Sequence, residues 1–290
     1  MIGLRISVCL LLLLSLLSCE VLHAQVWNKG SESLKRTRKK TERQGNRAKA
    51  WKDQILQWGL DSNYNYSLAA GAKLTTSGWS GGLVYLKQKK PGNKTVWQLY
   101  ISEIKHEKEI KQQRNGDDYR ELGKFRPFIL GKIHYCYTLQ LGYGKEQLLF
   151  PALLDGNMSV SFRYIIGPSL ALMKPVYLNL IYTDYIPEAV SHIQSEQYEN
   201  LNGEQFLNPG KILGADKWSK GLSEMKFIPG AFAEAAFILE PGRPKAFVKT
   251  ILIGGQFAFY TQKITIMANR KAYPYQMCFF VGINIGKRWK

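Results

Sequence analysis

The 290-residue chain has few acidic residues and few cysteines, and beyond its first residues it has no long apolar run. No segment after residue 24 offers the roughly 18 consecutive apolar residues of a membrane-spanning helix, which excludes a helical membrane protein. Only Cys136 and Cys278 follow that point, too few for a disulfide framework. Asp and Glu total 22 against 40 Lys and Arg, so the chain is basic, with a formal net charge of +18.

Catalytic motifs are also scarce. The sequence contains no H-E-x-x-H and no Walker glycine loop. Histidine is rare as well, and His134 with Cys136 supplies two ligands where a zinc site needs about four. We therefore expect no enzyme activity, no metal and no cofactor. An enzyme of the outer leaflet with acids on its loops is the less favoured alternative, and its candidate residues are Asp117, Asp118, Asp184 and Glu188.

The first 24 residues differ from everything that follows. Arg5 precedes an apolar run over 8–17, and Ala24 supplies a small residue before Gln25. This order is typical of a cleavable secretory signal peptide. The apolar core, about ten residues, is too short to cross roughly 30 Å of hydrocarbon, which disfavours a retained anchor. We predict a signal peptide over 1–24, with lipidation at Cys19 within Leu16-Leu17-Ser18-Cys19 as the alternative.

A basic leader is predicted over 25–62. Ten cations lie between Lys29 and Lys52 and only Glu32 and Glu42 oppose them, so this stretch carries +8 of the net charge. Export argues against a nucleic-acid partner. The leader is either a solvated tether or a contact with anionic headgroups or cell-wall carboxylates, worth about 1 kcal/mol per cation. The cations favoured for that contact are Arg36, Arg38, Lys39, Lys40 and Arg43.

A short amphipathic helix is predicted within the leader. Asn46 can cap it, and Gly59 stands where a glycine stop belongs. Trp51, Ile55 and Trp58 then fall at i, i+4 and i+7 on one face. Such a face suits a membrane interface, and packing against the mouth of the folded domain is the equal alternative.

From about residue 64 onward the apolar residues recur with period two. In the stretch 135–143, Tyr135, Leu139 and Leu141 share one phase, and in the last segment the apolar phase runs from Met277 to Trp289 with Phe280 as the exception. Such segments are strands with one apolar face. A lipocalin-like barrel hides that face, whereas an outer-membrane barrel shows it to lipid.

Three features favour the membrane barrel. The opposite phase is rich in Gly, Ser, Thr and Gln, a set that we do not expect to form a dry core. The chain ends within a strand, one residue past Trp289. The apolar faces begin or end with the aromatic residues Tyr66, Trp79, Trp97, Tyr143, Tyr164, Tyr182 and Trp289. We therefore predict an all-β fold, a closed antiparallel transmembrane up-and-down barrel over 63–290.

The connections favour eight strands, and splitting long segments would raise the count to ten. The predicted strands include 125–144 and a long, kinked 158–182, and 184–226 is predicted to be an insertion without a clear period. Long connections 107–124, 183–226 and 261–275 share one end, and tight turns 91–94 and 240–243 share the other, as barrels with short periplasmic turns require.

The charges predicted to face the lumen are Lys73, Arg163 and Glu234. Eight strands leave room only for side chains, and a buried charge there costs several kcal/mol unless it is paired. An Arg163–Glu234 or a Lys73–Glu234 pair is therefore expected as a structural plug.

Four stretches carry a resemblance to a known family. They are Ser77–Gly82 (SGWSGG), Glu103–Glu109 (EIKHEKE), Leu141–Gly144 (LGYG) and Leu172–Tyr177 (LMKPVY). They resemble a family of uncharacterised outer-membrane β-barrel proteins of Bacteroidetes-type bacteria, over roughly 64–290. The resemblance implies the barrel fold and an outer-membrane location, and it brings no activity or ligand with it.

The expected function is that of a non-enzymatic structural or accessory platform in the bacterial outer membrane. Its partners are membrane lipids, with anionic headgroups, the cell wall or an envelope protein as further candidates. A small passive, porin-like channel is the main alternative. It would need a wet lumen and more strands than eight.

Overall fold

The computed structural model describes residues 43, 46, 49–50, 53, 64–90, 92–113, 125–152, 157–184, 190–199, 201–242, 246–268 and 270–290. All the strands belong to one compact unit, Gln57–Lys290. No helix among the described residues is long and apolar enough to cross a membrane.

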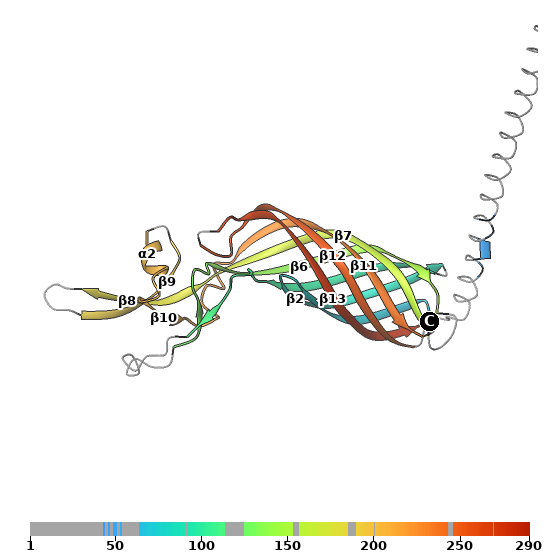
Figure 1. Ribbon diagram of the computed structural model, residues 1–290, viewed down its shortest axis with the longest axis horizontal. Coiled ribbons are helices and arrows are strands. Elements are labelled where there is room, and N and C mark those ends of the chain that lie inside the picture. Colours follow the sequence, from blue (N-terminus) through green and yellow to red (C-terminus); the bar gives the residue numbers. More distant parts are fainter. Residues whose placement is uncertain are drawn as a thin grey trace, which may run out of the picture. The chain divides into compact units, whose positions relative to one another are not determined.

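Within these residues, eight antiparallel strands close into a barrel (Figure 1). They are β1 (Tyr66–Thr75), β2 (Gly78–Lys90), β3 (Asn93–Ile104), β6 (His134–Phe150), β7 (Met158–Pro175), β11 (Lys226–Pro241), β12 (Phe247–Ile264) and β13 (Tyr273–Trp289). Each pairs with the barrel strands before and after it in the chain, and β1 pairs with β13 to close the ring. The predicted eight-stranded up-and-down barrel is confirmed.

The three longest connections share one end of the barrel, as predicted, although a two-residue turn lies there too. The turn at 76–77 and the connections 105–133, 176–225 and 265–272 lie at one end of the barrel. The connections 91–92, 151–157 and 242–246 lie at the other end, where the backbone N–H of Asn65 donates to the carbonyl of Trp289 at 3.1 Å. We call the first the distal end and the second the terminal end.

Side chains alternate strictly between the two faces of the sheet. In β13, Val281, Ile283 and Ile285 are each about half exposed, whereas Phe280 and Asn284 are buried. In β1, Leu68 faces outward and Lys73 inward. The apolar phase therefore forms the outside of the barrel, because strand residues of one parity share one face.

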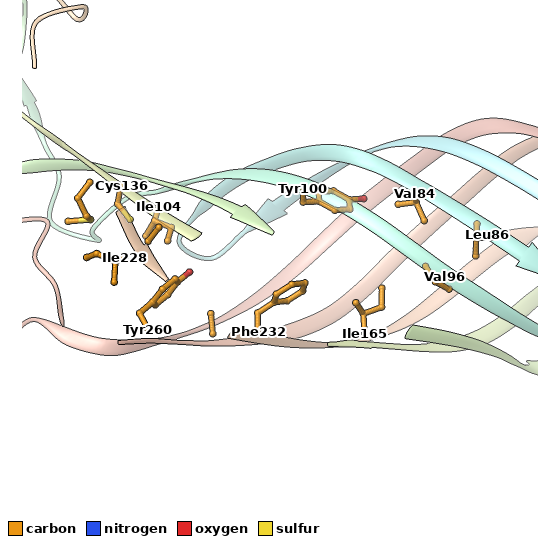
Figure 2. Close-up of a cluster of buried hydrophobic side chains, with 13 residues drawn as sticks. Val84, Leu86, Val96, Tyr100, Ile104, Cys136, Ile165, Ile228, Phe232 and Tyr260 are labelled. Atoms are coloured by element: carbon orange, nitrogen blue, oxygen red, sulfur yellow. The ribbon is translucent and has the colours of Figure 1, made fainter. Parts of the chain in front are cut away.

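The barrel interior corrects one expectation, because it holds an apolar core as well as polar side chains. Val84, Val96, Tyr100, Ile165 and Phe232 are buried there with their neighbours in one cluster. Figure 2 shows these side chains between the strands of the barrel. A smaller cluster joins Ala236, Ile238, Leu252 and Phe280. The inward phase is thus more apolar than its glycines and serines suggested.

A second structured part, the distal module, consists of the described parts of 105–133 and 176–225. Its main sheet has the order β10-β8-β9, from β8 (Tyr177–Asp184), β9 (Val190–Gln197) and β10 (Ile212–Ala215). A four-residue helix, α2 (Gly203–Phe206), and a ribbon of β4 (Lys111–Gln112) and β5 (Phe128–Ile129) complete it. Its core is formed by Phe128, Val176, Leu178, Leu180, Phe206 and Ile212.

The structure corrects three of the predicted segments. The strand predicted over 125–144 begins only at His134, because Pro127 lacks a backbone donor and Gly131 turns the chain with φ +74°. Phe128 instead packs into the core of the module. That strand also continues past residue 144 to Phe150.

The strand predicted over 158–182 changes sheet near its end. It stays in the barrel through Pro168, where a kink was expected, and leaves at Val176, after Pro175. The remainder, β8, joins the module, so the barrel keeps eight strands. The stretch 184–226, predicted to be an insertion without a clear period, contributes β9, α2 and β10.

Little of the predicted leader helix falls on described residues. Arg43, Asn46, Lys49, Ala50 and Asp53 are helical and exposed. Asn46, predicted as the cap, is itself helical, and the ends of the predicted helix lie outside the described residues. Trp51, Ile55 and Trp58 lie outside the described residues, as do the proposed signal peptide and its cleavage site.

Closure of the barrel can be tested at the seam between β1 and β13. Ala70 and Ile285 are cross-strand partners with outward side chains. We expect the Ala70→Cys/Ile285→Cys variant to form a disulfide on oxidation, because directly opposed Cβ atoms lie roughly 4.5–5.5 Å apart. Migration on non-reducing gels after boiling measures the cross-link.

The matched control is Ala70→Cys/Ile283→Cys, which is displaced by two residues in the register and should cross-link much less. Equal yields from the two variants would contradict the register of the seam.

Candidate functional site: a filled lumen below a structured module

The lumen contains a buried ion pair that spans the barrel. Lys73 Nζ lies 2.7 and 2.8 Å from the two carboxylate oxygens of Glu234, and Gln98 Nε2 donates to the same carboxylate at 3.2 Å. Lys73 also lies 3.9 Å from the ring centroid of Tyr100 and 4.6 Å from that of Phe280. Since β13 and β12 separate β1 from β11 in the sheet, this pair bridges the interior.

Arg163 has a different partner from the one considered from sequence. Its Nη2 and Nε lie 2.6 and 3.0 Å from Glu146 Oε2, and Lys94 Nζ reaches Glu146 Oε1 at 3.0 Å. A further buried pair joins Arg288 to Glu240 in a two-pronged contact of 2.6 and 2.8 Å. Each cation therefore meets a carboxylate, which offsets the cost of burial.

These side chains leave little of the lumen lining accessible. Lys73, Gln98, Tyr100, Arg163 and Glu234 are each exposed by 4% or less. The lining of an open, water-filled pore would be accessible to solvent. Along the described strands the lumen is therefore filled by ion pairs and apolar side chains together.

Comparison with known proteins adds a likeness to solved barrels. Neisserial surface protein A (NspA) aligns with a TM-score of 0.36 and 4% identity, covering 79% of this chain and 98% of its own. The attachment invasion locus protein Ail of Yersinia pestis, solved in complex with the heparin analogue sucrose octasulfate, aligns with a TM-score of 0.34 and 8% identity, covering 78% and 97%.

No family model and no curated protein matches the chain. The uncharacterised family suggested by the sequence resemblance therefore stays a prediction.

A G-x-S-x-G motif, which sequence reasoning missed, lies within a barrel strand. Gly78–Gly82 has the form G-x-S-x-G, in which a hydrolase serine stands on a sharp strand-to-helix turn. Ser80 instead lies within β2, paired to Lys73 on one side and to Ser102 on the other, and it is buried in the lumen. The structural context that this motif requires is absent around Ser80.

His134 and Cys136 also have structural surroundings. His134 Nδ1 lies 2.9 Å from the carbonyl oxygen of Thr265, which fixes the ring at the distal end of the lumen. Cys136 is a fully buried free thiol within the apolar cluster.

The distal module carries its own polar contacts. Tyr182, predicted as a girdle residue, lies in this module on β8 and not in the barrel, and its hydroxyl donates to Glu196 at 2.9 Å. Burial and Glu196 together raise the pKa of Tyr182 to about 12. The Tyr177 hydroxyl donates to Glu224 at 2.7 and 2.9 Å, and this bond raises the pKa of Tyr177 to about 12. Both phenols stay protonated donors at neutral pH.

Of the leader residues predicted to contact an anionic surface, only Arg43 is described, as an exposed helical residue. Arg36, Arg38, Lys39 and Lys40 lie outside the described residues, and the contact stays a prediction.

The lumen pair should control stability. We expect Lys73→Met to lower the free energy of unfolding by about 3–5 kcal/mol, because it leaves the Glu234 carboxylate buried without its cation. Lys73→Met/Glu234→Gln should recover most of the loss, since no buried charge then remains unpaired. Urea titrations followed by tryptophan fluorescence measure both.

The control is Lys220→Met, which removes a half-exposed partner of Asp216. Exposed pairs contribute roughly 0–1 kcal/mol. A loss as large in Lys220→Met as in Lys73→Met would contradict the role of the lumen pair.

Proposed function

We propose that this protein is a non-enzymatic anchor of the bacterial outer membrane that holds the distal module outside the cell. The observation that carries the proposal is the combination of a continuous apolar belt on the barrel exterior with a filled lumen. The belt supports insertion into lipid, and the filled lumen supports a platform over a channel.

Every barrel strand contributes exposed apolar side chains to this belt. In a soluble protein, such a contiguous patch is rare beyond a few hundred Å². A barrel can turn it to lipid because closure satisfies all strand backbone hydrogen bonds. The belt is formed by Leu68, Leu74, Leu83, Leu99, Ile101, Leu139, Leu141, Ile166, Phe227, Phe237, Ile251, Ile253, Phe257, Phe279, Val281, Ile283 and Ile285.

Aromatic side chains border the belt at both ends. Near the terminal end, the rings of Tyr66 and Trp289 stack with centroids 6.3 Å apart, and those of Trp97 and Tyr143 lie 4.7 Å apart. Near the distal end, Tyr275 packs against Phe257 and Tyr273, with centroids 6.3 and 5.4 Å away. Aromatic girdles of this kind mark the two interfaces of outer-membrane barrels.

Strand length fits the same proposal. The barrel strands have between 10 and 18 residues, and a tilted strand needs roughly 9–11 to cross the hydrocarbon. Short turns face the periplasm in such barrels and long loops face outward. The terminal end then faces the periplasm and the distal module faces the exterior.

The signal peptide over 1–24 and the basic leader over 25–62 complete the proposal. Export through the inner membrane requires the former. The latter would stand on the periplasmic side, where its cations can meet anionic headgroups or the cell wall. Membrane lipids are the principal partner, and an envelope protein bound through the module is the second.

Insertion can be tested with one substitution at two exposed leucines. Leu141, half exposed in the belt, should lose roughly 2–4 kcal/mol of stability on Leu141→Arg if it lies near the bilayer midplane. Leu201, 98% exposed in the distal module, should tolerate Leu201→Arg within about 0.5 kcal/mol. Urea unfolding of the protein folded into lipid vesicles measures both.

Equal tolerance of the two changes would contradict insertion, as would recovery of the wild-type protein from the soluble periplasmic fraction. That result would favour the lipocalin-like alternative.

The channel alternative predicts conductance, and the proposed anchor does not. We expect the purified protein to give no stepwise current in planar bilayers, because the Lys73–Glu234 pair and the apolar clusters fill the lumen. A porin reconstituted in parallel controls for the assay. Regular conductance steps from the wild-type protein would overturn the platform in favour of the channel.

A further inference from the structure

A basic pocket lies where the distal module meets β6 and β7. Its volume is about 280 Å³, and its lining brings together parts of the chain that are far apart in sequence. Four of the lining residues are cations and one is an acid, Asp216. The cations are Lys111 of β4, Arg126 before β5, Lys174 near the end of β7 and Lys217 after β10.

The carboxylate of Asp216, the acid of the pocket, already has partners of its own. Asp216 Oδ2 accepts from Ser195 Oγ at 2.5 Å and lies 3.1 Å from Lys220 Nζ, and Asp216 Oδ1 accepts from the backbone N–H of Lys217 at 2.6 Å. Burial works to raise the pKa of Asp216, but these three partners hold it below its ordinary value. Asp216 is therefore ionised, and its charge is met by Lys220 and by uncharged donors, not by the charged side-chain groups of the four pocket cations.

Lys174 is a buried cation without a counter-charge among the described residues. It is 2% exposed, and its ammonium lies 5.2 Å from the ring centroid of Tyr135 and 5.5 Å from that of Trp218. Lys73 and Lys132 are equally buried, but they reach Glu234 and Glu109 at 2.7 and 2.6 Å. Within the described part of the chain, the Lys174 side chain makes no ion pair and no hydrogen bond.

Burying an ammonium is costly unless a counter-charge accompanies it. The side chains of Lys111, Arg126 and Lys217 likewise form no ion pair among the described residues, although they are exposed. Among the described residues, these four cations line one cavity without forming an ion pair to any carboxylate. An anionic ligand would supply the counter-charge that Lys174 lacks among those residues.

The shape of the pocket narrows the ligand class. Its volume greatly exceeds that of a site for one water, roughly 10–15 Å³ on the same measure, so a bare anion would leave most of it empty. Trp218 borders the cavity, and its Nε1 donates to the Tyr137 hydroxyl at 3.4 Å, which orients the indole. A fixed, half-exposed indole offers a flat apolar face for a sugar ring.

We propose that this pocket binds a phosphorylated sugar, with the phosphate against Lys174 and Arg126 and the sugar ring against Trp218. The guanidinium of Arg126 suits phosphate because it can donate two parallel hydrogen bonds. This inference deepens the proposed function and rests on it, since the module then faces the space where such sugars occur. The phosphosugar can belong to a glycolipid headgroup of the same membrane or to a soluble glycan.

Calorimetry on the purified protein in detergent micelles tests the pocket, with glucose 6-phosphate, inorganic phosphate and glucose as probes. We expect glucose 6-phosphate to bind more tightly than phosphate, and glucose not to bind. Lys174→Met should weaken glucose 6-phosphate by roughly tenfold or more, as expected for a lost contact to a charged group. Trp218→Leu should remove the preference for glucose 6-phosphate over phosphate.

Lys211→Met is the matched control, because it removes an exposed cation of the module that does not line the pocket. It should bind as the wild type does. Arg126→Gln and Lys217→Gln, at exposed positions, repeat the test without disturbing a buried residue. Absence of binding at millimolar glucose 6-phosphate, or equal binding by wild type and Lys174→Met, would overturn the proposal.

The source of the sugar is decided in vesicles. If the glycolipid is the ligand, wild-type protein in vesicles that contain a phosphorylated glycolipid should lose binding of soluble glucose 6-phosphate, and in vesicles without it should keep that binding. Retention in both supports a soluble glycan. Because the pocket assay uses micelles, a failure to bind sugar phosphate and a failure of the Leu141 test of insertion are separate results.

Discussion

The barrel depends on the requirement that every backbone N–H and C=O on a strand find a partner. β1 meets it on both sides, since each of its residues from Tyr66 to Thr75 is paired with β2 and also with β13. An open sheet would leave two edges without partners, which lipid cannot satisfy. In a closed sheet the number of strands sets the width of the lumen, and eight strands enclose a space that side chains fill. The ion pairs and apolar clusters of the interior are consequences of that width.

Two opposed apolar surfaces follow from the same closed sheet. The outer surface is a belt of large side chains, whereas the inner surface alternates apolar clusters with paired charges. Lys73 and Glu234 join strands that are not neighbours, so their contact ties opposite walls of the barrel. In the short stretch Leu83–Leu86, four consecutive apolar residues serve both surfaces, with Val84 and Leu86 inward and Leu83 outward. A sequence that is apolar on both phases is thus compatible with a membrane barrel when its lumen is narrow.

Sequence periodicity predicted the barrel well and the module poorly, for a physical reason. Barrel strands have one face in each environment, so β13 shows its phase over its whole length. The strands of the module do not have one face in each environment. Ile212, Leu213 and Gly214 of β10 are all buried, and the apolar residues of β8 continue the alternation of β7 although β8 belongs to another sheet.

The Lys73–Glu234 pair of the lumen was predicted, whereas the partner of Arg163 was not, for a related reason. Because the fourth barrel strand was predicted to end at Gly144, Glu146 fell outside it, and Glu234 was the only acid considered as a partner for Arg163.

The module owes its position to the barrel and not to a flexible link. Only Val176 separates β7 from β8, and its backbone N–H donates to the Ile133 carbonyl at 2.8 Å. Ile133 in turn donates to the Ile266 carbonyl at 2.8 Å, so three distal connections are bonded to one another at the rim. The proposed pocket draws its lining from two of these connections and from β6 and β7, so the hydrogen-bonded rim holds its cations around one cavity despite their mutual repulsion. That repulsion is tolerable if a ligand supplies the counter-charge, which links the shape of the rim to the proposed recognition of an anionic sugar.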